Sequence, residues 1–479
     1  MHDSLLLSDQ HFLNGTWQTG RSSTTLQIQD AYSGELLADI LTLSAEQMEA
    51  AIQASVEGFQ ALKSWSAQRK SQALEQLANL LEAQAEAFAQ LIAAEAGKPI
   101  WYARGEIKRC LLTLRTAAAE ALRFGGEVVP LDFAAGEGRQ AFTRRFPIGP
   151  IAAISPFNFP LNLALHKIAP ALAVGCSILL KPSPYAPLSA LAFARLVEQT
   201  DLPAGAVQVV LADIPEAELM VRDERLKMLS FTGSPGVGWK LKSLAGKKRV
   251  CLELGGNAAV YVDESADLAT AAKRIALGAY LYAGQICIST QRIYVHEAVR
   301  ADFQELLLAE IQQLPVGDPA DDSVRIGPLI AAVHLKRVQN WVVEAMEEGA
   351  SCLLGGKVLD EPHLLYAPTL LTDTRPEMNV VAEEVFGPVA ILESVPSFEA
   401  GLAAINDSRF GLQAGIFTHR LAHLRQAHEQ LEVGAVLMNE IPGFRVDSMP
   451  YGGAKDSGFG REGICYAMEE MTEPRLLVY

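Results

Sequence analysis

From residue 150 onward, short apolar runs alternate with longer stretches of helical character, and this pattern constrains the fold more than any other feature of the chain. Strand-length runs separated by segments long enough for a helix are typical of βαβ units, whose strands pair in parallel. The first series comprises Ile151–Ile154, Ser177–Leu180, Val207–Leu211, Met228–Phe231 and Val250–Leu254. The second comprises Ala258–Val262, Gln291–Val295, Val389–Val395, Ala414–Phe417 and Ala435–Met438. We therefore predict an α/β fold with two parallel-sheet α/β domains and a crevice between them.

The first 150 residues carry a different pattern, which favours helices after an irregular opening. The segment Ser44–Trp65 is amphipathic, and Ser44 and Gln47 have the spacing of a capping box. A second helix is predicted from Ser66 to the region of Gly97, and a third over Trp101–Phe124. We expect these helices to cover a sheet.

The composition favours a globular protein that acts on small molecules. With 479 residues, 49% of them hydrophobic, the chain is long enough for two or three domains. The formal net charge of -16 disfavours nucleic acid and anionic membranes as partners, because both repel an acidic surface. The longest apolar stretch, Leu161–Leu180, contains Asn162, His166, Lys167 and Pro170, which favours buried structure over a membrane span.

The cysteines and the start of the chain bear on its location. The six cysteines form no C-x-x-C pair, which argues against a zinc knuckle or a redox motif. The first residues lack a basic region and a long apolar run, so no export signal is expected. We therefore predict reduced thiols and a cytoplasmic location.

Three residues in loop-like contexts have the chemistry of an acyl-transfer site. Cys287 follows a predicted helix over Asp267–Tyr282, and a thiol there could take an acyl group covalently. Glu253 ends an apolar strand, where a carboxylate in a dry cleft would gain the raised pKa of a general base. Asn158 lies between a strand and a helix, and its amide could donate to an oxyanion. Taken singly, each has a structural alternative: a buried thiol, a salt-bridged strand end and a loop asparagine.

Small and polar residues follow several first-series strands, at the edge where α/β sheets bind nucleotides. Lys181 follows one strand, and Gly233 and Ser234 lie between another strand and a helix, where N–H groups and a hydroxyl could bind phosphate. Glu384 precedes a turn and could accept a hydrogen bond from a ribose hydroxyl. The segment from Phe231 to Gly238 is no G-x-G-x-x-G fingerprint, so its glycines alone are weak evidence for a dinucleotide.

Two histidines raise the question of a metal site. His419 and His423 have i, i+4 spacing, but no carboxylate pattern accompanies them. We expect a solvated helix face and no metal.

Seven segments taken together resemble the aldehyde dehydrogenase superfamily in their order and spacing. They are Ser155-Pro156-Phe157-Asn158-Phe159-Pro160, Lys181-Pro182-Ser183, Phe231-Thr232-Gly233-Ser234, Leu252-Glu253-Leu254-Gly255-Gly256-Asn257, Gly284-Gln285-Ile286-Cys287, Glu383-Glu384-Val385-Phe386-Gly387-Pro388 and Pro450-Tyr451-Gly452-Gly453-Ala454-Lys455-Asp456-Ser457-Gly458. The resemblance covers nearly the whole chain. It implies an NAD(P)-dependent, hydrolytic enzyme similar to lactaldehyde and semialdehyde dehydrogenases.

The resemblance also implies a domain organisation. A Rossmann-like NAD(P)-binding domain would span residues 1–125 and 146–254, and a catalytic domain would span 255–448. A small β oligomerisation element over 126–145 and 465–479 would build a homodimer or homotetramer. The apolar, strand-like end of the chain agrees with a buried interface, although it could equally add a strand to its own sheet.

Roles follow from the resemblance residue by residue. Cys287 is implied to be the nucleophile, the Asn158 amide and the Cys287 backbone N–H the oxyanion donors, and Glu253 the base for deacylation. The implied cofactor contacts are Lys181, Ser183, Gly233, Ser234, Glu384, Phe386 and Phe157. The implied reaction is thiolate attack on an aldehyde, followed by hydrolysis of a thioester to a carboxylate.

One departure from the family concerns the cofactor. Many NAD-preferring members carry a glutamate three residues after the lysine, where it binds the 2'-hydroxyl and repels a 2'-phosphate. This chain has Pro184 at that position, and Ser183 could help hold a phosphate. The cofactor is therefore predicted as NAD or NADP.

The substrate is predicted only as a small aldehyde. The segment Gly443–Pro450 is similar to the loop that lines the aldehyde entrance, and Arg445 within it, or Arg109 on the third predicted helix, could bind an anionic tail. The alternative for these arginines is a salt bridge, to Asp447 or to a helix neighbour. Ile286 and Ile288 flank the nucleophile, and the apolar Ile286 suits an uncharged aldehyde better than a phosphate-bearing one.

Two other functions remain open. A CoA-acylating relative would pass the thioester to a thiol, but such members generally lack the base at Glu253. A non-catalytic binding protein on the same fold is disfavoured because Cys287, Glu253 and Asn158 are all present.

Overall fold

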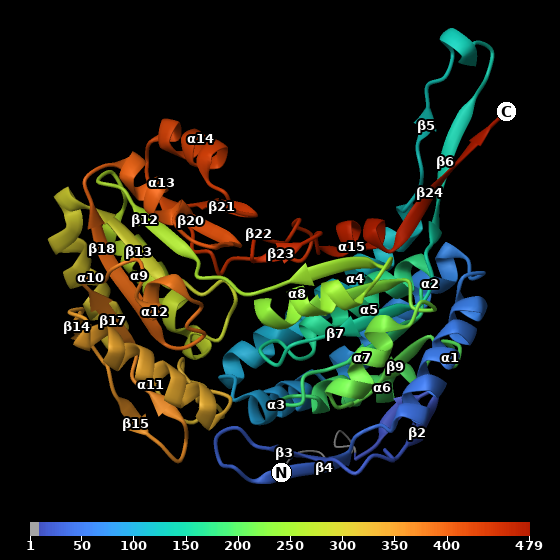
Figure 1. The fold of residues 1–479 in the computed structure, drawn as a ribbon, viewed down its shortest axis with the longest axis horizontal. Helices are drawn as coiled ribbons and strands as arrows, with labels where there is room; N and C mark the ends of the chain where they lie inside the picture. The colour runs from blue at the N-terminus through green and yellow to red at the C-terminus, as the bar shows by residue number, and fades with distance from the viewer. Residues whose placement is uncertain (1–8) are drawn as a thin grey trace.

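Each series of apolar runs forms a sheet of its own, and the two sheets lie in separate lobes (Figure 1). The computed structural model describes residues 9–479. The first sheet has the order β2-β1-β9-β8-β7-β10-β11-β23 and the second the order β14-β17-β18-β13-β12-β20-β21. The α/β class with two largely parallel sheets is confirmed.

The first sheet has a parallel centre and antiparallel edges. The parallel strands are β7 (Ile151–Ile154), β8 (Ile178–Lys181), β9 (Val207–Val209), β10 (Met228–Thr232) and β11 (Arg249–Glu253). The edges are β1 (His11–Leu13), β2 (Thr16–Gln18) and β23 (Gly458–Phe459).

Helices cover both faces of this sheet because its strands are apolar on both sides. Ile151 and Ala153 pack into one core, whereas Ala152 between them packs into another. The first core is closed by α2 (Ala67–Ala83), α3 (Ala85–Ala96), α4 (Ile100–Arg123), α5 (Asn162–Val174), α6 (Leu188–Val197) and α15 (Ile464–Glu470). The second is closed by α1 (Ala45–Leu62), α7 (Ile214–Arg222) and α8 (Pro235–Leu244). The alternation follows from the two-residue period of a strand.

The second lobe also consists of a largely parallel sheet packed against helices, and it has a single hydrophobic core. Its strands are β12 (Ala259–Val262), β13 (Arg292–His296), β14 (Ser351–Leu354), β17 (Thr369–Thr372), β18 (Val389–Val395), β20 (Gln413–Phe417) and β21 (Ala435–Met438). Its helices are α9 (Leu268–Tyr280), α10 (Arg300–Gln312), α11 (Ala332–Glu347), α12 (Asn379–Ala382), α13 (Phe398–Asn406) and α14 (Leu421–Gln430). Small two-stranded pairs join β15 (Val358–Asp360) to β16 (Leu365–Tyr366) and β19 (Phe410–Gly411) to β22 (Ala454–Lys455).

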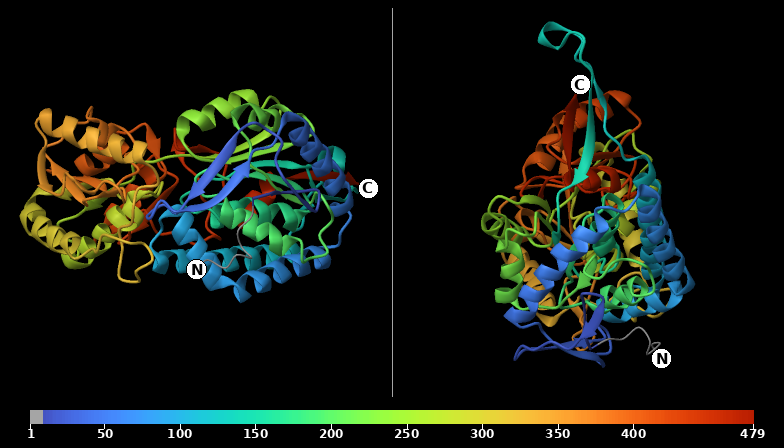
Figure 2. Two further views of the ribbon diagram at one scale, coloured as in Figure 1. Left: turned by 90° about the horizontal axis from the view of Figure 1, so that it is seen from below. Right: turned by 90° about the vertical axis from the view of Figure 1, so that its right-hand side faces the viewer.

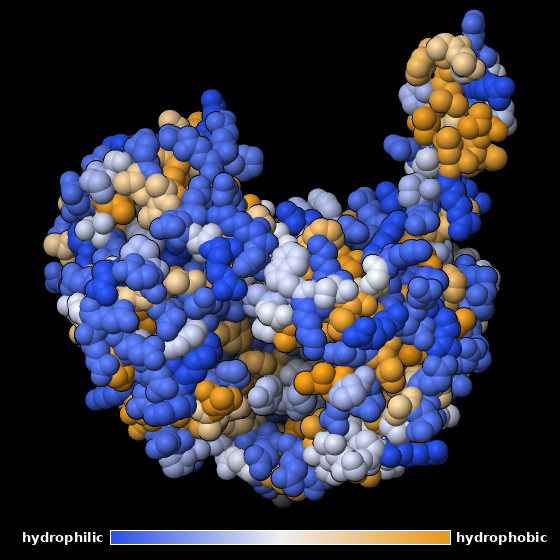
Figure 3. Space-filling view, viewed as in Figure 1, coloured by the Kyte–Doolittle hydropathy of each residue, from blue (hydrophilic) through white to orange (hydrophobic). Residues whose placement is uncertain are grey.

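A β arm projects from the first lobe (Figures 1 and 2). It consists of β5 (Val128–Val129), β6 (Ala141–Pro147) and β24 (Thr472–Val478), with β6 in the middle. Val128, Phe142 and Leu477 are register partners across the three strands, and Val128 and Leu477 are 83% and 53% exposed. Hydrophobic side chains gather visibly on the arm (Figure 3). The last strand therefore pairs within its own chain but leaves an apolar surface uncovered.

Three local predictions differ from the structure. The opening is not irregular, because it contains β1, β2 and the hairpin of β3 (Thr25–Gln29) and β4 (Leu36–Leu41). The second predicted helix is two helices, since Gln84 leaves helical geometry (φ -118°, ψ 18°) without a glycine or proline to mark the break. The segment α15 packs on α5 and contributes Ile464 and Met468 to the first core rather than to the arm.

No helix among residues 9–479 is both long enough and apolar enough to cross a membrane.

Candidate active site

A cavity of about 570 Å³ lies at the carboxyl edge of the first sheet. Ile154, Lys181, Thr232 and Glu253, the last residues of β7, β8, β10 and β11, all line it. Residues of the second lobe close it from the other side: Cys287, His334, Arg337, Glu384 and Phe386. Parallel strands end at one edge, so the fold gathers side chains that are far apart in the sequence.

Cys287 is held in a strained loop after α9. Tyr282 and Ala283 have φ of 54° and 53°, in the left-handed region that side chains other than glycine rarely adopt. The loop lies against the end of β11, where a Cβ on Gly256 would be 2.7 Å from the Cys287 carbonyl oxygen. Glycine at 256 is therefore needed for the thiol loop to approach Glu253. Burial raises the pKa of the Cys287 thiol to about 11, although a hydrogen bond with Tyr451 opposes the shift.

Asn158 connects the first lobe to this loop. Its Nδ2 donates to the Gln285 carbonyl oxygen at 3.0 Å, and the side chain is buried. An amide nitrogen carries two hydrogens, so one N–H stays available beside Cys287. Within residues 9–479, the Cys287 backbone N–H donates to no protein atom. Two donors thus lie next to the thiol without a protein acceptor.

Glu253 is buried at the end of β11, and neither of its carboxyl oxygens has a hydrogen-bond partner among the described residues. Burial, and then the neighbouring charge of Glu462, raise the pKa of Glu253 well above its usual value. Space for this carboxyl is provided by Gly452, where a Cβ would lie 2.9 Å from Glu253 Oε1. A carboxyl with this environment has the proton affinity of a general base.

The cavity wall beside the first sheet suits a phosphate and a ribose. Lys181 has a pKa lowered by burial, and its ammonium forms no hydrogen bond with the described residues. Ser234 occupies the N-cap of α8 but does not use its hydroxyl as a cap, so the hydroxyl and the helix N-terminus face the cavity together. Gly233 lines the same wall, and Ser183 accepts a hydrogen bond from the Tyr185 N–H.

The opposite wall is formed by Glu384, Phe386 and Phe157. Glu384 accepts from the Gly256 N–H at 3.0 Å, and burial raises the pKa of this carboxyl to about 7. Phe386 has φ of 46°, and its ring meets that of Phe157 edge to face at 5.9 Å. The structure therefore brings all seven predicted cofactor contacts to one cavity or its rim. Unpartnered Lys181 and Ser234 next to apolar rings match the donor set that a dinucleotide requires.

The two predicted substrate arginines lie in one buried ionic network. Arg109 Nη2 lies 2.7 Å from Asp447 Oδ1, and Arg445 Nε lies 3.8 Å from the same atom. His166 bridges them, with Nε2 2.9 Å from Asp447 and Nδ1 2.8 Å from Arg445. Although burial opposes its ionisation, Asp447 has a pKa held well below its usual range by His166 and Arg109. Both arginines therefore pair with Asp447, and Arg445 Nη2 also lies 3.9 Å from Glu462 Oε2.

Apolar residues surround the other side of the thiol. Ile286 and Ile288 are 8% and 5% exposed and pack in one cluster with Cys287, Phe159, Leu163, Tyr282, Leu412 and Tyr451. The predicted residues Ile286 and Ile288 thus contribute to the wall around the nucleophile candidate.

Several residues near the site were not predicted as site residues from the sequence. Lys167 is fully buried on α5 and lies 2.7 Å from Glu462, while Tyr451 contacts Cys287. A signal for Lys167 was present, because it and His166 are charged or polar residues inside an otherwise apolar stretch. Tyr451 belongs to one of the seven segments that carry the resemblance, but no role was predicted for it, and Glu462 carried no signal in the sequence.

The prediction that His419 and His423 share a solvated helix face was wrong. His423 is packed rather than solvated: its ring stacks on Phe398 at 4.0 Å and its Nδ1 lies 2.9 Å from Asp263. His419 precedes α14 rather than sharing its face. Among residues 9–479, no group of three or more metal-ligand side chains is present.

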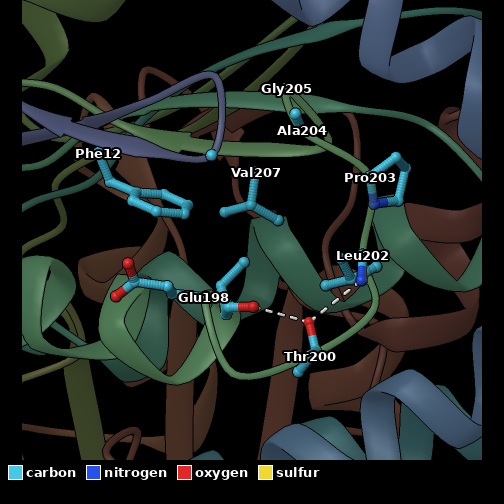
Figure 4. Close-up of a pocket in the computed structure, with 10 residues that line it drawn as sticks. Phe12, Glu198, Thr200, Leu202, Pro203, Ala204, Gly205 and Val207 are labelled. Atoms are coloured by element: carbon cyan, nitrogen blue, oxygen red, sulfur yellow. Dashed lines mark hydrogen bonds between the residues drawn. The ribbon is translucent and has the colours of Figure 1, made fainter.

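A second cavity, of about 220 Å³, lies between β1 and the loop after α6 (Figure 4). It is lined by Phe12, Val207 and Leu202, and Thr200 bonds within its own loop to the Val197 carbonyl and the Leu202 N–H. Its lining includes Glu198 and Thr200 but none of the residues predicted from the sequence as site residues.

Comparisons with known proteins agree with this site. Residues 17–477 match the model of the Aldehyde dehydrogenase family. The chain is 41% identical to a 3-sulfolactaldehyde dehydrogenase from Priestia aryabhattai, over 98% of this chain and 97% of that one. Its structure is similar to aldehyde dehydrogenase 21 from Physcomitrella patens, crystallised with its product succinate (TM-score 0.95, 39% identity, 98% of each chain). It is also similar to an NADP dependent enzyme from E. coli (TM-score 0.96, 32% identity, 100% of this chain and 99% of that one).

Solved relatives include both NAD- and NADP-dependent enzymes, which agrees with the dinucleotide-sized donor set of the cavity. The match spans nearly the whole chain, and the thiol, the amide and the carboxyl converge at the carboxyl edge of the first sheet. The chain belongs to the aldehyde dehydrogenase family and is an NAD(P)-dependent oxidoreductase that converts an aldehyde to a carboxylic acid.

Proposed function

We propose that Cys287 is the nucleophile of this dehydrogenase, with Asn158 and the Cys287 N–H as oxyanion donors and Glu253 as the hydrolytic base. The observation that carries the proposal is the convergence of these groups in one cavity, with the two donors free of protein acceptors. The Cys287 thiolate attacks the carbonyl carbon, and the resulting oxyanion is held by Asn158 Nδ2 and the Cys287 N–H. NAD(P)+ supplies the hydride acceptor when bound.

Hydrolysis is the step that depends on Glu253. Its carboxylate takes a proton from water as the water oxygen attacks the thioester on Cys287, and the sulfur leaves as thiolate. The product is a carboxylic acid. Because Glu253 has a raised pKa, it holds that proton readily and can return it to solvent afterwards.

The test separates acylation from deacylation. In Glu253→Gln, one equivalent of reduced cofactor should form rapidly, an acyl-enzyme should accumulate by mass spectrometry, and steady-state turnover should fall about 10²- to 10⁴-fold. In Cys287→Ala, neither the burst nor the acyl-enzyme should appear. Aldehyde oxidation by Cys287→Ala would overturn the assignment. Formation of an acyl-CoA when CoA is added to the wild type would favour the acylating alternative.

The cofactor contacts are proposed residue by residue. Lys181 and Glu384 would bind ribose hydroxyls. Ser234 and Gly233 would bind the pyrophosphate. Phe157 and Phe386 would form the walls of the cavity around the nicotinamide. Support comes from the position of all of them at one cavity. Ser183 and Pro184 also line it, and no carboxylate occupies position 184, so we propose that NADP is accepted as well as NAD.

For the substrate, we propose a small aldehyde with an anionic tail. Arg109 and Arg445 both lie near Asp447, and Arg445 also lies 3.9 Å from Glu462, which already pairs with Lys167, so three cationic side chains share two carboxylates. The Arg445 Nε is buried and has no hydrogen-bond partner among the described residues. Two relatives act on or release such compounds, 3-sulfolactaldehyde and succinate.

Two matched aldehydes test this preference. A four-carbon aldehyde ending in a carboxylate should be oxidised with a higher kcat/KM than the uncharged four-carbon aldehyde. Arg445→Gln should reduce the ratio of the two kcat/KM values about tenfold or more, because a hydrogen-bonded charge pair contributes about 1.5–3 kcal/mol. Equal kcat/KM for both aldehydes in the wild type would remove the anionic-tail proposal and leave the uncharged aldehyde.

We also propose a homodimer or homotetramer built through the arm, and a cytoplasmic location. The exposed apolar row of Val128, Phe142 and Leu477 supports the first proposal, because monomers rarely leave such a surface in water. Free thiols at all six cysteines support the second, since reduced cysteines are typical of that compartment. The domain ranges stay a proposal, with α15 assigned to the cofactor domain by its packing.

A further inference from the structure

One side chain among the described residues forms a hydrogen bond with the Cys287 sulfur. Tyr451 Oη lies 3.1 Å from Cys287 Sγ, and among residues 9–479 no other side-chain donor or acceptor is hydrogen-bonded to this sulfur. Tyr451 is 3% exposed, so its hydroxyl has little access to bulk water. The remaining neighbours in this cluster are apolar side chains. The contact therefore governs how the protein solvates a charge on sulfur.

Tyr451 is fixed in place by two independent interactions. Its N–H donates to the Glu462 carbonyl oxygen at 2.9 Å, and the Glu462 N–H donates back at 2.7 Å. The Arg445 guanidinium lies 3.6 Å from the centre of the Tyr451 ring, and Arg445 is itself held by His166. A cation over the ring draws electron density from the phenol and makes its O–H a stronger hydrogen-bond donor.

The chemistry of the two groups sets the direction of the hydrogen bond. A thiol is a weak donor and acceptor, whereas a thiolate is a strong acceptor, so a phenol O–H at this distance favours the ionised sulfur. Burial raises the pKa of Tyr451 well above its usual value, with the Cys287 charge as a further cause, so the phenol keeps its proton. Tyr451 is thus a donor here and not the base that removes the thiol proton.

We propose that Tyr451 is a catalytic residue whose hydroxyl donates a hydrogen bond to the Cys287 thiolate and so stabilises the nucleophile. This inference rests on the proposed function, in which Cys287 is the nucleophile. It deepens that function by naming the group that allows a thiol in an apolar cluster to ionise. The alternative is that Tyr451 serves only as an aromatic wall, in which case its hydroxyl is dispensable.

The test measures thiolate formation directly. Full-length wild type and Tyr451→Phe are treated with iodoacetamide from pH 5 to 10, and alkylation of the Cys287 peptide is followed by mass spectrometry beside loss of activity. The phenylalanine keeps the ring and removes only the hydroxyl. Because the pKa of the buried thiol is about 11, the whole range lies below the midpoint of alkylation, and a rise of about one unit in that midpoint should make alkylation about tenfold slower at every pH tested. The burst of reduced cofactor should slow by a similar factor.

Tyr102→Phe is the matched control. Tyr102 packs against the same cluster but is not hydrogen-bonded to Cys287, so removing its hydroxyl should leave the alkylation midpoint unchanged. Thermal unfolding of each variant checks that it is folded. An unchanged midpoint in folded Tyr451→Phe would overturn the role of the hydroxyl. If complete alkylation of Cys287 left aldehyde oxidation intact in the wild type, the proposed nucleophile itself would fail, whatever the Tyr451 result.

Discussion

Glu106 and Lys98 form a completely buried ion pair beneath the loop that carries Asn158. Glu106 Oε1 accepts hydrogen bonds from the N–H groups of Leu161 and Asn162, at 3.1 and 3.0 Å, where α5 begins. The Lys98 ammonium lies 3.7 Å from the centre of the Phe159 ring. Through these contacts the pair holds the segment after Asn158 in place, although neither side chain lines the cavity.

Removing one member of this pair should destabilise the protein strongly. Glu106→Gln leaves the Lys98 charge buried without a counter-ion, and breaking a buried pair in this way costs about 3–5 kcal/mol. We expect a clear fall in the midpoint of thermal unfolding. Glu86→Gln, which breaks an exposed pair with Arg104, should change stability by less than about 1 kcal/mol. Equal midpoints for the two variants would contradict the role of the buried pair.

The pH dependence of turnover should report the charge beside Glu253. As the proposed base, Glu253 would act when ionised, and its pKa is raised by burial and by Glu462, so steady-state turnover should rise with pH through that raised value. Glu462→Gln removes the neighbouring negative charge and leaves the Lys167 cation, so the rising limb should move to lower pH. Arg461→Gln removes a positive charge that lowers the pKa of Glu253, so the rising limb of the pH–rate profile of this variant should move to higher pH. Superimposable pH–rate profiles for all three proteins would refute this assignment.

Cofactor preference should respond to a charge at position 184. Wild-type enzyme is expected to use NADP at least as well as NAD, because Pro184 presents no carboxylate to a 2'-phosphate. Pro184→Glu should lower kcat/KM for NADP relative to NAD by about tenfold or more, since like charges in contact cost several kcal/mol. Pro184→Gln, of similar size but uncharged, is the control and should shift the ratio much less. Strict NAD dependence of the wild type would sink this prediction.

The arm should control assembly. Leu477→Glu places a charge at one end of the apolar row formed by Val128, Phe142 and Leu477. We expect light scattering after size exclusion to show a smaller species than for the wild type, because burying an unpaired carboxylate at an interface is unfavourable. Leu421→Glu, at another exposed leucine, should leave the mass unchanged. A wild type that runs as a monomer would contradict the proposed oligomer.

Much of the fold could be predicted from the sequence because local signals agreed with the final packing. The parallel strands that end at Ile154, Lys181 and Glu253 were visible as apolar runs, since both faces of each strand are covered by helices. The break at Gln84 was not visible, because no residue there disfavours a helix and only the packing of α3 requires the bend. The strands of the opening were missed because β1 and β2 are only three residues long and β3 has one exposed face.

The sequence alone determined the residues available for chemistry: a thiol at 287, a carboxyl at 253 and an amide at 158, each next to a strand end or a tight turn. The tertiary structure decided how those groups behave. It buried Glu253 beside Glu462, enclosed Cys287 among apolar side chains, and brought Tyr451 from more than 160 positions away to 3.1 Å from the sulfur. Proton affinities depend on burial and on neighbouring charges, and both are set by parts of the chain that no local pattern connects.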